Sequence, residues 1–406
     1  MKCIVAVLCF VFISCDNNVA FNKSVISVSD HVNIHYLLNL SDYADSITYI
    51  PLETTGAVLL SDIKQIAYEN ELIVLLDKNN HCEIYDKQGV YKKGLAAVGN
   101  GPNEFVYLNS FDLNPQSHRI LLKGGPNRSL IYDYEGNICG RISYPEPLYN
   151  IVVNDIVFFN NDTFYVDVAS WDDFYFKGFL FVSNDTIADI LVEYPNFISR
   201  KKERKGYSLS FENGLVYRFN NEIKTYKSIN DTLFVLGDDL KMYDEYVFDF
   251  GRYKLPTKLI FEDGNDSLIN YIWVTNIQES SRYLFLDLFF GNHAPEPFEY
   301  LKYFPDGSTA LCTNYNVCAI YDKETYTLKY LSQPIKSKFG FFNDIDNGPA
   351  VWPKYISSEN LLITYCSVEE FMECYDNIEK PSARMKEIAD NLNLDDNPIV
   401  IIAHFK

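Results

Sequence analysis

Histidine, the side chain that most often binds metals or moves protons near neutral pH, occurs only six times in these 406 residues. A zinc site needs several His, Cys or carboxylate ligands that converge, and short spacings often announce it. His31 and His35 are the closest pair, but they lie in a segment that we expect to be a solvated tether and show no HExxH pattern. The other four are His81, His118, His293 and His404. The sequence therefore predicts no metal centre.

Motifs for nucleophilic catalysis or phosphate binding are missing from the sequence. It contains no Gly-x-Ser-x-Gly elbow, P-loop or dinucleotide fingerprint, and the glycines at 99 and 101 are followed by Pro102 rather than Lys-Ser/Thr. Acidic pairs such as Asp172–Asp173, Asp238–Asp239 and Asp395–Asp396 suit turns. Two carboxylates across a pocket would suit glycoside hydrolysis, but spacing along the chain cannot test this. We therefore expect no catalytic residue.

Aromatic and loop residues are the candidates for ligand binding. Trp171, Trp273 and Trp352 would form a sugar-stacking surface if they converged, and Trp352 lies in a Gly/Pro-containing loop over residues 347–353. Packing in the core is the alternative for each ring. The turn with Asn103, Glu104 and Phe105 is a second candidate, with a structural role as its alternative. A third is the basic run 200–205, which includes Arg200 and Lys201 and is either a solvated loop or an anion contact.

Overall charge limits the possible partners. The formal net charge is −20. A strongly acidic body repels nucleic acid and anionic lipid headgroups, since both are bound through clustered Lys and Arg. We therefore expect no nucleic-acid partner.

The N-terminus predicts export and a lipid anchor. Lys2 is followed by an apolar run over residues 4–13, too short to cross a bilayer as a helix. The run closes on Ser14 and Cys15, and an apolar run with this ending resembles the lipobox of bacterial lipoproteins, in which the cysteine is acylated after cleavage. The alternative is an ordinary cleaved signal peptide with an incidental cysteine. We expect a signal peptide over residues 1–14, a lipid anchor and tether over residues 15–44, and one domain over residues 45–406.

Cysteines beyond Cys15 offer one candidate disulfide. An exported protein meets oxidising conditions, so pairing is feasible. Cys312 and Cys318 flank five residues that look like a hairpin connection, which would place the two thiols opposite each other. The alternative is that both are small buried apolar side chains.

Internal repeats indicate an all-β fold. Segments 83–90, 130–138 and 319–326 each hold an alternating strand, a Tyr-Asp pair, a tight turn and the start of another strand. A second element, Asn-Asp followed by Thr or Ser and an apolar residue, recurs at 161–164, 184–187, 230–233 and 265–268 and predicts a turn followed by a strand. Repeated hairpins with few helices are typical of propellers.

The two ends of the domain are predicted to pair. Residues 46–52 and 398–405 both have a buried-strand pattern, and their pairing would close a ring of six blades and remove an exposed sheet edge. One helical insert is expected over residues 367–392. It begins with a Ser-x-x-Glu capping box at Ser367, continues with apolar residues at helical spacing, and resumes after Pro381. We expect the insert to pack against the last blade; binding a partner is the alternative.

Residues 99–105, Gly-Asn-Gly-Pro-Asn-Glu-Phe, resemble a turn between blades in the six-bladed β-propeller lipoproteins of gut Bacteroidota, distant relatives of the NHL-repeat propellers. Segments 229–233, 248–251 and 254–256 are similar to that family's central part, and 396–398 to its ending. Asn103 stands where the family has a glycine. The resemblance covers residues 44–406 and implies the fold, export and lipidation, but no activity.

Two functions follow as hypotheses. The first is a non-catalytic binding or scaffold module in the cell envelope, anchored in the outer membrane, whose partner is a glycan, a peptide or an envelope protein. The second is a hydrolase or lyase with a divalent cation at the propeller pore. Some distant relatives of the propeller family hold a metal there through histidines, and His81 and His118 are the candidates here.

Overall fold

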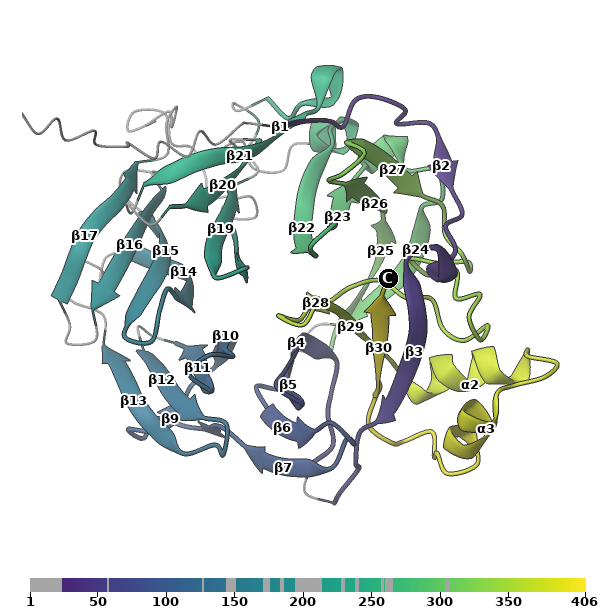
Figure 1. Ribbon diagram of the computed structural model, residues 1–406, viewed down its shortest axis with the longest axis horizontal. Coiled ribbons are helices and arrows are strands. Elements are labelled where there is room, and N and C mark those ends of the chain that lie inside the picture. The colour runs from purple at the N-terminus through teal and green to yellow at the C-terminus, as the bar shows by residue number, and fades with distance from the viewer. Residues whose placement is uncertain are drawn as a thin grey trace, which may run out of the picture.

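A computed structural model describes residues 24–406 of the chain, except 57, 126–127, 144–150, 171–175, 183–185, 194–213, 228–230, 238–240, 257–258, 260–265 and 304–306. Antiparallel sheets follow one another around a central axis, so that the chain forms an all-β β-propeller with two short α-helices (Figure 1). In this part of the chain, six sheets have four or five strands each, and two further sheets have two strands. The predicted fold class, an all-β propeller with a helical insert, is confirmed.

Three four-stranded sheets are built from consecutive strands, each joined to the next by a tight turn. Their strands are β4 (Ile63–Glu69), β5 (Leu72–Asp77), β6 (Cys82–Asp86) and β7 (Tyr91–Gly94); β10 (Leu108–Asn114), β11 (Arg119–Gly124), β12 (Arg128–Asp133) and β13 (Ile138–Ser143); and β14 (Ile151–Phe158), β15 (Thr163–Ser170), β16 (Phe176–Val182) and β17 (Thr186–Glu193). The first strand of each lies nearest the axis (Figure 1).

Two five-stranded sheets each gain an outer strand from the N-terminal segment. Their strands are β18 (Leu215–Phe219), β19 (Glu222–Lys227), β20 (Thr232–Leu236), β21 (Met242–Asp249) and β1 (Ser24–Ser27); and β22 (Trp273–Glu279), β23 (Tyr283–Phe289), β26 (Asn316–Asp322), β27 (Thr327–Leu331) and β2 (His35–Tyr36). Strands β1 and β2 pair in parallel with β21 and β27. The predicted tether over residues 15–44 is therefore wrong from Ser24 onward, because Ile26 and Val28 are buried apolar residues that join the core.

The two ends of the domain share one sheet, as predicted. This sheet has the order β28 (Tyr355–Ile356), β29 (Leu361–Cys366), β30 (Ile399–Phe405) and β3 (Ala44–Pro51). Strand β30 lies between β29 and β3, with Ile401 opposite Tyr49. Both edges of the C-terminal strand are thus paired, which closes the ring.

The Tyr-Asp segments lie at the ends of β6, β12 and β26, each the third strand of its sheet. The tyrosines are core residues, and the aspartates accept hydrogen bonds from backbone N–H groups of the following turn, such as Val90 N to Asp86 at 3.0 Å. The Asn-Asp-Thr element precedes β15, β17 and β20 as expected. At residues 265–268 the prediction is wrong: Asp266–Asn270 form a 3₁₀ helix, η4, because Asp and Ser also begin helical turns.

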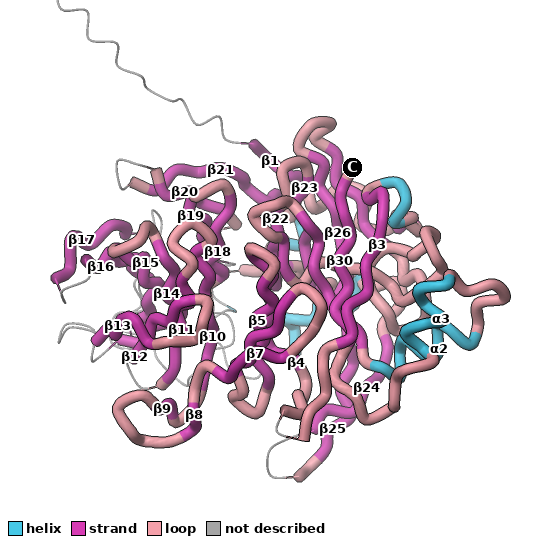
Figure 2. The backbone as a smooth tube through the Cα atoms, turned by 60° about the horizontal axis from the view of Figure 1, so that its bottom comes forward, coloured by secondary structure: helices cyan, strands magenta, loops and turns pink. Residues whose placement is uncertain are grey.

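Two helices pack outside the ring beside β3 (Figures 1 and 2). Helix α2 (Val368–Asp376) begins at Ser367, whose hydroxyl accepts a hydrogen bond from Glu370 N at 3.1 Å. Helix α3 (Ala383–Ala389) begins at Ser382 in the same way. Phe371, Met385 and Ile388 join the same apolar cluster as β30, so the insert packs against the last sheet as predicted. No helix in the described residues is long and apolar enough to cross a membrane.

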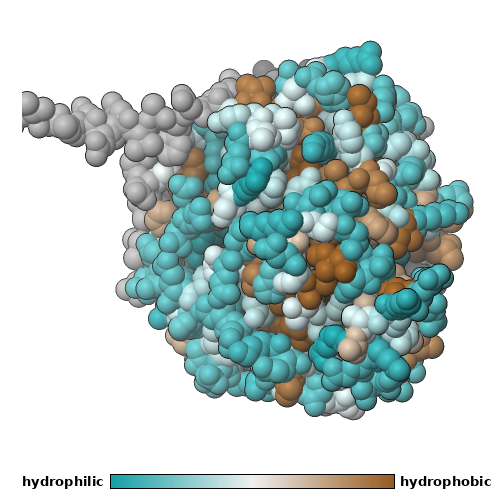
Figure 3. All heavy atoms as spheres, turned by 45° about the vertical axis from the view of Figure 1, so that its right-hand side comes forward, coloured by the Kyte–Doolittle hydropathy of each residue, from teal (hydrophilic) through white to brown (hydrophobic). Residues whose placement is uncertain are grey.

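Short elements complete the fold. They are β8 (Ala97–Val98), β9 (Glu104–Phe105), η1 (Leu40–Asp42), η3 (Gly251–Tyr253), η5 (Gly291–His293), and the hairpin β24 (Phe298–Tyr303) and β25 (Thr309–Asn314). The hairpin is inserted between β23 and β26, and Leu301 and Leu311 face each other across it with 55% and 63% exposure. Figure 3, with the side that carries β3 turned forward, shows a mostly hydrophilic surface with apolar residues gathered near its middle.

The predicted Cys312–Cys318 disulfide is wrong. Both cysteines are free thiols. Cys312 lies on β25 opposite Tyr300, whereas Cys318 lies on β26 opposite Asp287. The chain passes from one sheet to another between the two cysteines, so the expected hairpin connection does not exist.

Candidate binding cavity

A cavity of about 800 Å³ lies on the propeller axis. It is lined by residues from β4, β10, β14, β18, β22 and β28, the first strands of the six larger sheets. Turns that follow these strands also contribute, among them the one that holds Asn220 and Asn221. A first strand has no strand partner on its axial side, so its residues there can be polar and remain open to a ligand.

Side chains connect neighbouring sheets around the cavity. The amide of Gln65 on β4 donates a hydrogen bond to Phe111 O at 2.7 Å and accepts one from Phe111 N at 3.0 Å. This pair satisfies both backbone groups of Phe111 in place of a neighbouring strand. Lys64 similarly donates to Leu108 O at 2.9 Å, and burial lowers the pKa of its ammonium. These hydrogen bonds link two neighbouring sheets at the cavity wall.

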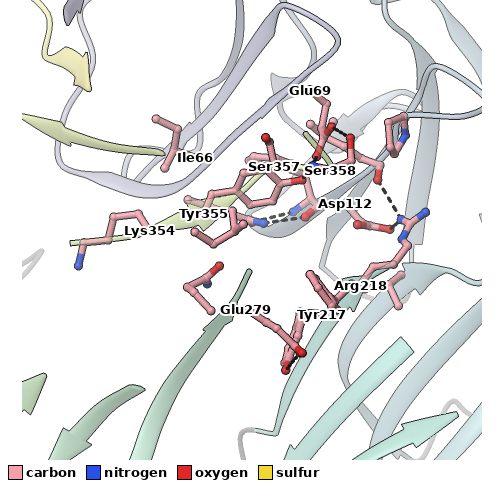
Figure 4. Close-up of a pocket in the computed structure, with 18 of the residues that line it drawn as sticks. Ile66, Glu69, Asp112, Tyr217, Arg218, Glu279, Lys354, Tyr355, Ser357 and Ser358 are labelled. Carbon is pink, nitrogen blue, oxygen red and sulfur yellow. Dashed lines mark hydrogen bonds and ion pairs between the residues drawn. The ribbon is translucent and has the colours of Figure 1, made fainter. Parts of the chain in front are cut away.

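Glu69, buried at the end of β4, joins the first sheet to the last. Its carboxylate accepts hydrogen bonds from the Tyr355 hydroxyl and from Ser358 N, both at 2.7 Å, and from the Ser358 hydroxyl (Figure 4). Burial raises the pKa of the carboxyl, although these hydrogen bonds favour its charged form. The carboxylate is therefore held by neutral donors rather than by a cation.

Asp112 and Arg218 form an ion pair across the cavity wall. The Arg218 guanidinium lies 2.6 Å from the Asp112 carboxylate and also donates to Leu113 O at 2.9 Å (Figure 4). Asp112 accepts a second hydrogen bond from Phe158 N at 2.8 Å. Burial raises the pKa of Asp112, and Arg218 opposes that shift. The pair links the second sheet to the fourth.

A buried ion network lies beside the cavity between the two five-stranded sheets. The Lys224 ammonium contacts Glu245 at 2.6 Å and Glu279 at 3.0 Å. Glu279 also accepts from Lys323 at 2.7 Å and from the Tyr217 hydroxyl at 2.8 Å. Burial alone would lower the pKa of Lys224, but the two carboxylates raise it. The network satisfies the charge of Glu279, which lines the cavity.

The remaining charged residues of the cavity wall are Asp155 and Lys354. Asp155 accepts hydrogen bonds from the Ser110 hydroxyl at 3.0 Å and from Ile156 N at 2.8 Å, and burial raises its pKa. Within the described residues, the Lys354 ammonium has no hydrogen-bond or ion-pair partner. Most charges at the cavity are therefore satisfied inside the protein.

The turn of Asn103, Glu104 and Phe105 has a structural role. Glu104 accepts a hydrogen bond from Gly101 N at 2.8 Å, and Asn103 accepts one from Arg141 at 2.6 Å. Phe105 is 1% exposed and belongs to the core. None of the three lines the cavity.

Of the two tryptophans that the structure describes, Trp352 is buried and does not contribute to a sugar-stacking surface. Trp352 is 5% exposed, and its indole donates a hydrogen bond to Asp287 at 2.6 Å. Trp273 stacks on Phe289 with ring centroids 4.1 Å apart. Core packing, the alternative for Trp352, is what the structure shows. Trp171, Cys15, Arg200 and Lys201 lie outside the described residues.

The histidines do not meet at the pore. His81 contacts Asp77 at 3.0 Å, and the ring of His118 packs on Tyr134. Neither lines the cavity. His35 lies against Phe290 and Tyr330 and bonds Val32 O at 2.9 Å, so its predicted solvated setting is wrong. Among the described residues, no group of three or more His, Cys, Asp or Glu side chains could hold a metal ion.

Sequence reasoning missed the cavity residues Glu69, Arg218, Glu279 and Tyr355. One signal was available: Glu69 and Glu279 are each the last residue of a first strand. A polar residue at that place in a propeller repeat points toward the axial region. The partners of these side chains come from other repeats, and no spacing along the chain reveals them.

Comparisons with known proteins give a family and a fold. The model of a family described as "Domain of unknown function (DUF4934)" matches residues 23–404. The crystal structure of a "putative exported protein" from Bacteroides fragilis NCTC 9343 is similar, with 16% identity, a TM-score of 0.66, and coverage of 95% of this chain and 100% of that one. The WD40 repeats of RRP9 match with 10% identity, a TM-score of 0.44, and coverage of 91% and 99%. No curated protein matches.

Proposed function

The chain belongs to the DUF4934 family, and from that premise we propose that it is an exported, lipid-anchored propeller that binds a polar ligand in its axial cavity without converting it. Each of the six larger sheets counts as one blade in this proposal. Support for the location comes from the N-terminal sequence and from the similar Bacteroides fragilis protein, which is described as exported.

The observation that carries the binding role is the axial cavity itself. Its volume of about 800 Å³ is large enough for several sugar rings or a short peptide. All six larger sheets contribute to its wall, so the ring holds the cavity in shape. Its ionisable groups are held mainly by structural partners: Glu69 by Tyr355 and Ser358, and Asp112 by Arg218. Such an arrangement favours recognition over proton transfer.

Binding is tested by filling the cavity. We expect the detergent-solubilised full chain to bind a member of a defined panel of oligosaccharides and short peptides, measured by titration calorimetry. Gln278→Trp and Gln116→Trp, each placing a large ring at the cavity wall, should abolish that binding without changing the thermal melt. Binding that survives both substitutions contradicts the axial site.

The same panel tests for turnover. Incubation of the panel, together with ester, lactone and glycoside substrates, should give no product with added Ca²⁺ or Zn²⁺. A stoichiometric metal, with product formation that a chelator stops, contradicts the binding-only proposal and favours a metal-dependent hydrolase or lyase.

Cys15 is proposed as the lipid attachment site. Cys15→Ala removes the only thiol at the end of the apolar N-terminal run. We expect this variant to move from the detergent-rich to the aqueous phase in phase partitioning, whereas Cys139→Ala, at an exposed thiol of the propeller, should partition like the natural chain. Retention of Cys15→Ala in the detergent phase contradicts lipidation at this residue.

A further inference from the structure

Four side-chain amides at the cavity wall are not used by the fold. Within the described part of the chain, the amide groups of these residues have no hydrogen-bond partner: Gln116, Asn220, Asn221 and Gln278. They differ from Gln65, whose amide is fully occupied by Phe111. Their donors and acceptors are therefore available to a ligand.

The four amides come from three sheets. Gln116 lies in the turn between β10 and β11, Asn220 and Asn221 form the turn between β18 and β19, and Gln278 lies on β22. Positive φ angles of 49° and 64° explain why asparagine occurs at positions 220 and 221, since asparagine tolerates this conformation. The backbone conformation does not explain why all four amide residues line one cavity.

The polar surface extends beyond the axial cavity. A neighbouring hollow of about 450 Å³ shares Gln116, Arg218 and Asn221 with it and adds Asn160 and Asn161. In this turn between β14 and β15, the Asn160 amide oxygen accepts hydrogen bonds from Asp162 N at 3.0 Å and Thr163 N at 2.9 Å, so its NH₂ group and the Asn161 side chain are what the hollow adds. A ligand that fills both spaces would be elongated and would meet amides along its length.

The chemistry of the wall favours a neutral ligand rich in hydroxyl groups. An amide donates and accepts at once, as a sugar hydroxyl does, so the two pair in both directions. A charged ligand would find Arg218 and Glu279 already paired, and within the described residues Lys354 is the one charged group of the wall that it could pair with directly. Tyr217 and Tyr355 add aromatic rings to the wall, which suit the apolar faces of sugars, whereas the Phe219 ring already holds the Lys323 ammonium 4.5 Å from its centroid.

We propose that the ligand is a neutral oligosaccharide, held by the amides of Gln116, Asn221 and Gln278 along the axial cavity and the neighbouring hollow. The proposal rests on the binding role proposed above and names the ligand class for the same site.

The test compares neutral oligosaccharides with acidic ones and with peptides. The detergent-solubilised full chain is titrated with neutral glucan, mannan and xylan fragments, with oligogalacturonates, and with a mixed peptide set. We expect at least one neutral fragment to bind. Gln116→Ala and Gln278→Ala should each weaken that binding roughly 3- to 10-fold, the loss of about one hydrogen bond. Gln88→Ala, in the turn between β6 and β7 outside the cavity wall, is the matched control and should bind like the natural chain.

The outcomes separate the two proposals. If only oligogalacturonates or only peptides bind, and Gln278→Trp stops that binding, the axial site stands and the neutral sugar is wrong. If neutral fragments bind with unchanged affinity in both alanine variants, the role of the amides is wrong. If nothing in the panel binds, both proposals are contradicted. Thermal melts of each variant show whether the fold is retained.

Discussion

Replacing Lys224 with alanine is expected to lower the free energy of unfolding by about 3–5 kcal/mol, because it leaves buried carboxylates without their shared cation. The Lys224 side chain is 2% exposed and that of Glu279 is 1% exposed. Glu279 keeps Lys323 and Tyr217 in the variant, but Glu245 loses the one cation that contacts it within the described residues. Urea denaturation followed by far-UV circular dichroism measures the difference.

The matched control is Lys87→Ala. Lys87 also forms a short ion pair, 2.5 Å from Glu71, but both side chains are well exposed. Exposed pairs contribute little to stability, because water screens them and already solvates each charge. Equal losses in the two variants would show that burial of the Lys224 network does not matter for stability.

Deletion of residues 398–406 is expected to abolish cooperative unfolding. Strand β30 is the third strand of the last sheet, with paired strands on both sides, and Ile399 to Ala403 are all buried. The deletion therefore removes two sets of strand hydrogen bonds and leaves β29 and β3 with unpaired edges, which promote aggregation. We expect the truncated chain to elute as large species in size-exclusion chromatography.

A point substitution nearby controls for general damage to the C-terminus. Leu394 precedes β30 and is 74% exposed, so Leu394→Ala should leave the elution volume and the melt unchanged. A truncated chain that stays monomeric and melts cooperatively would contradict closure by β3 and β30.

The sequence carried most of the information about the fold, because hairpins are local. Tyr85 and Asp86 lie next to the turn that they define, and the repeat of this pattern identified the propeller. The capping box at Ser367 identified α2 for the same reason. Pairing of residues 46–52 with 398–405 followed from a general rule, that closed rings leave no free edge.

The cavity could not be predicted in the same way. Asp112 meets Arg218, and Glu69 meets Ser358, across large separations in sequence and between different sheets. Neither the residue types nor their spacing along the sequence indicates that these residues form pairs. Glu104 and Trp352 are candidates from the sequence because glycine, proline and aromatic residues surround them. In the structure, Glu104 stabilises a turn and Trp352 packs in the core.

The N-terminal strands have a consequence for the order of folding. Strands β1, β2 and β3 pair with β21, β27 and β30, so three sheets each need one strand from the first 51 residues and the rest from much later in the chain. Contacts between residues far apart in sequence form slowly, since a long loop must close before they do. A chain that emerges N-terminus first must therefore keep each of these strands unpaired until its own partner, β21, β27 or β30, has followed. Strand β3 waits longest, because its partner β30 is the last strand of the chain.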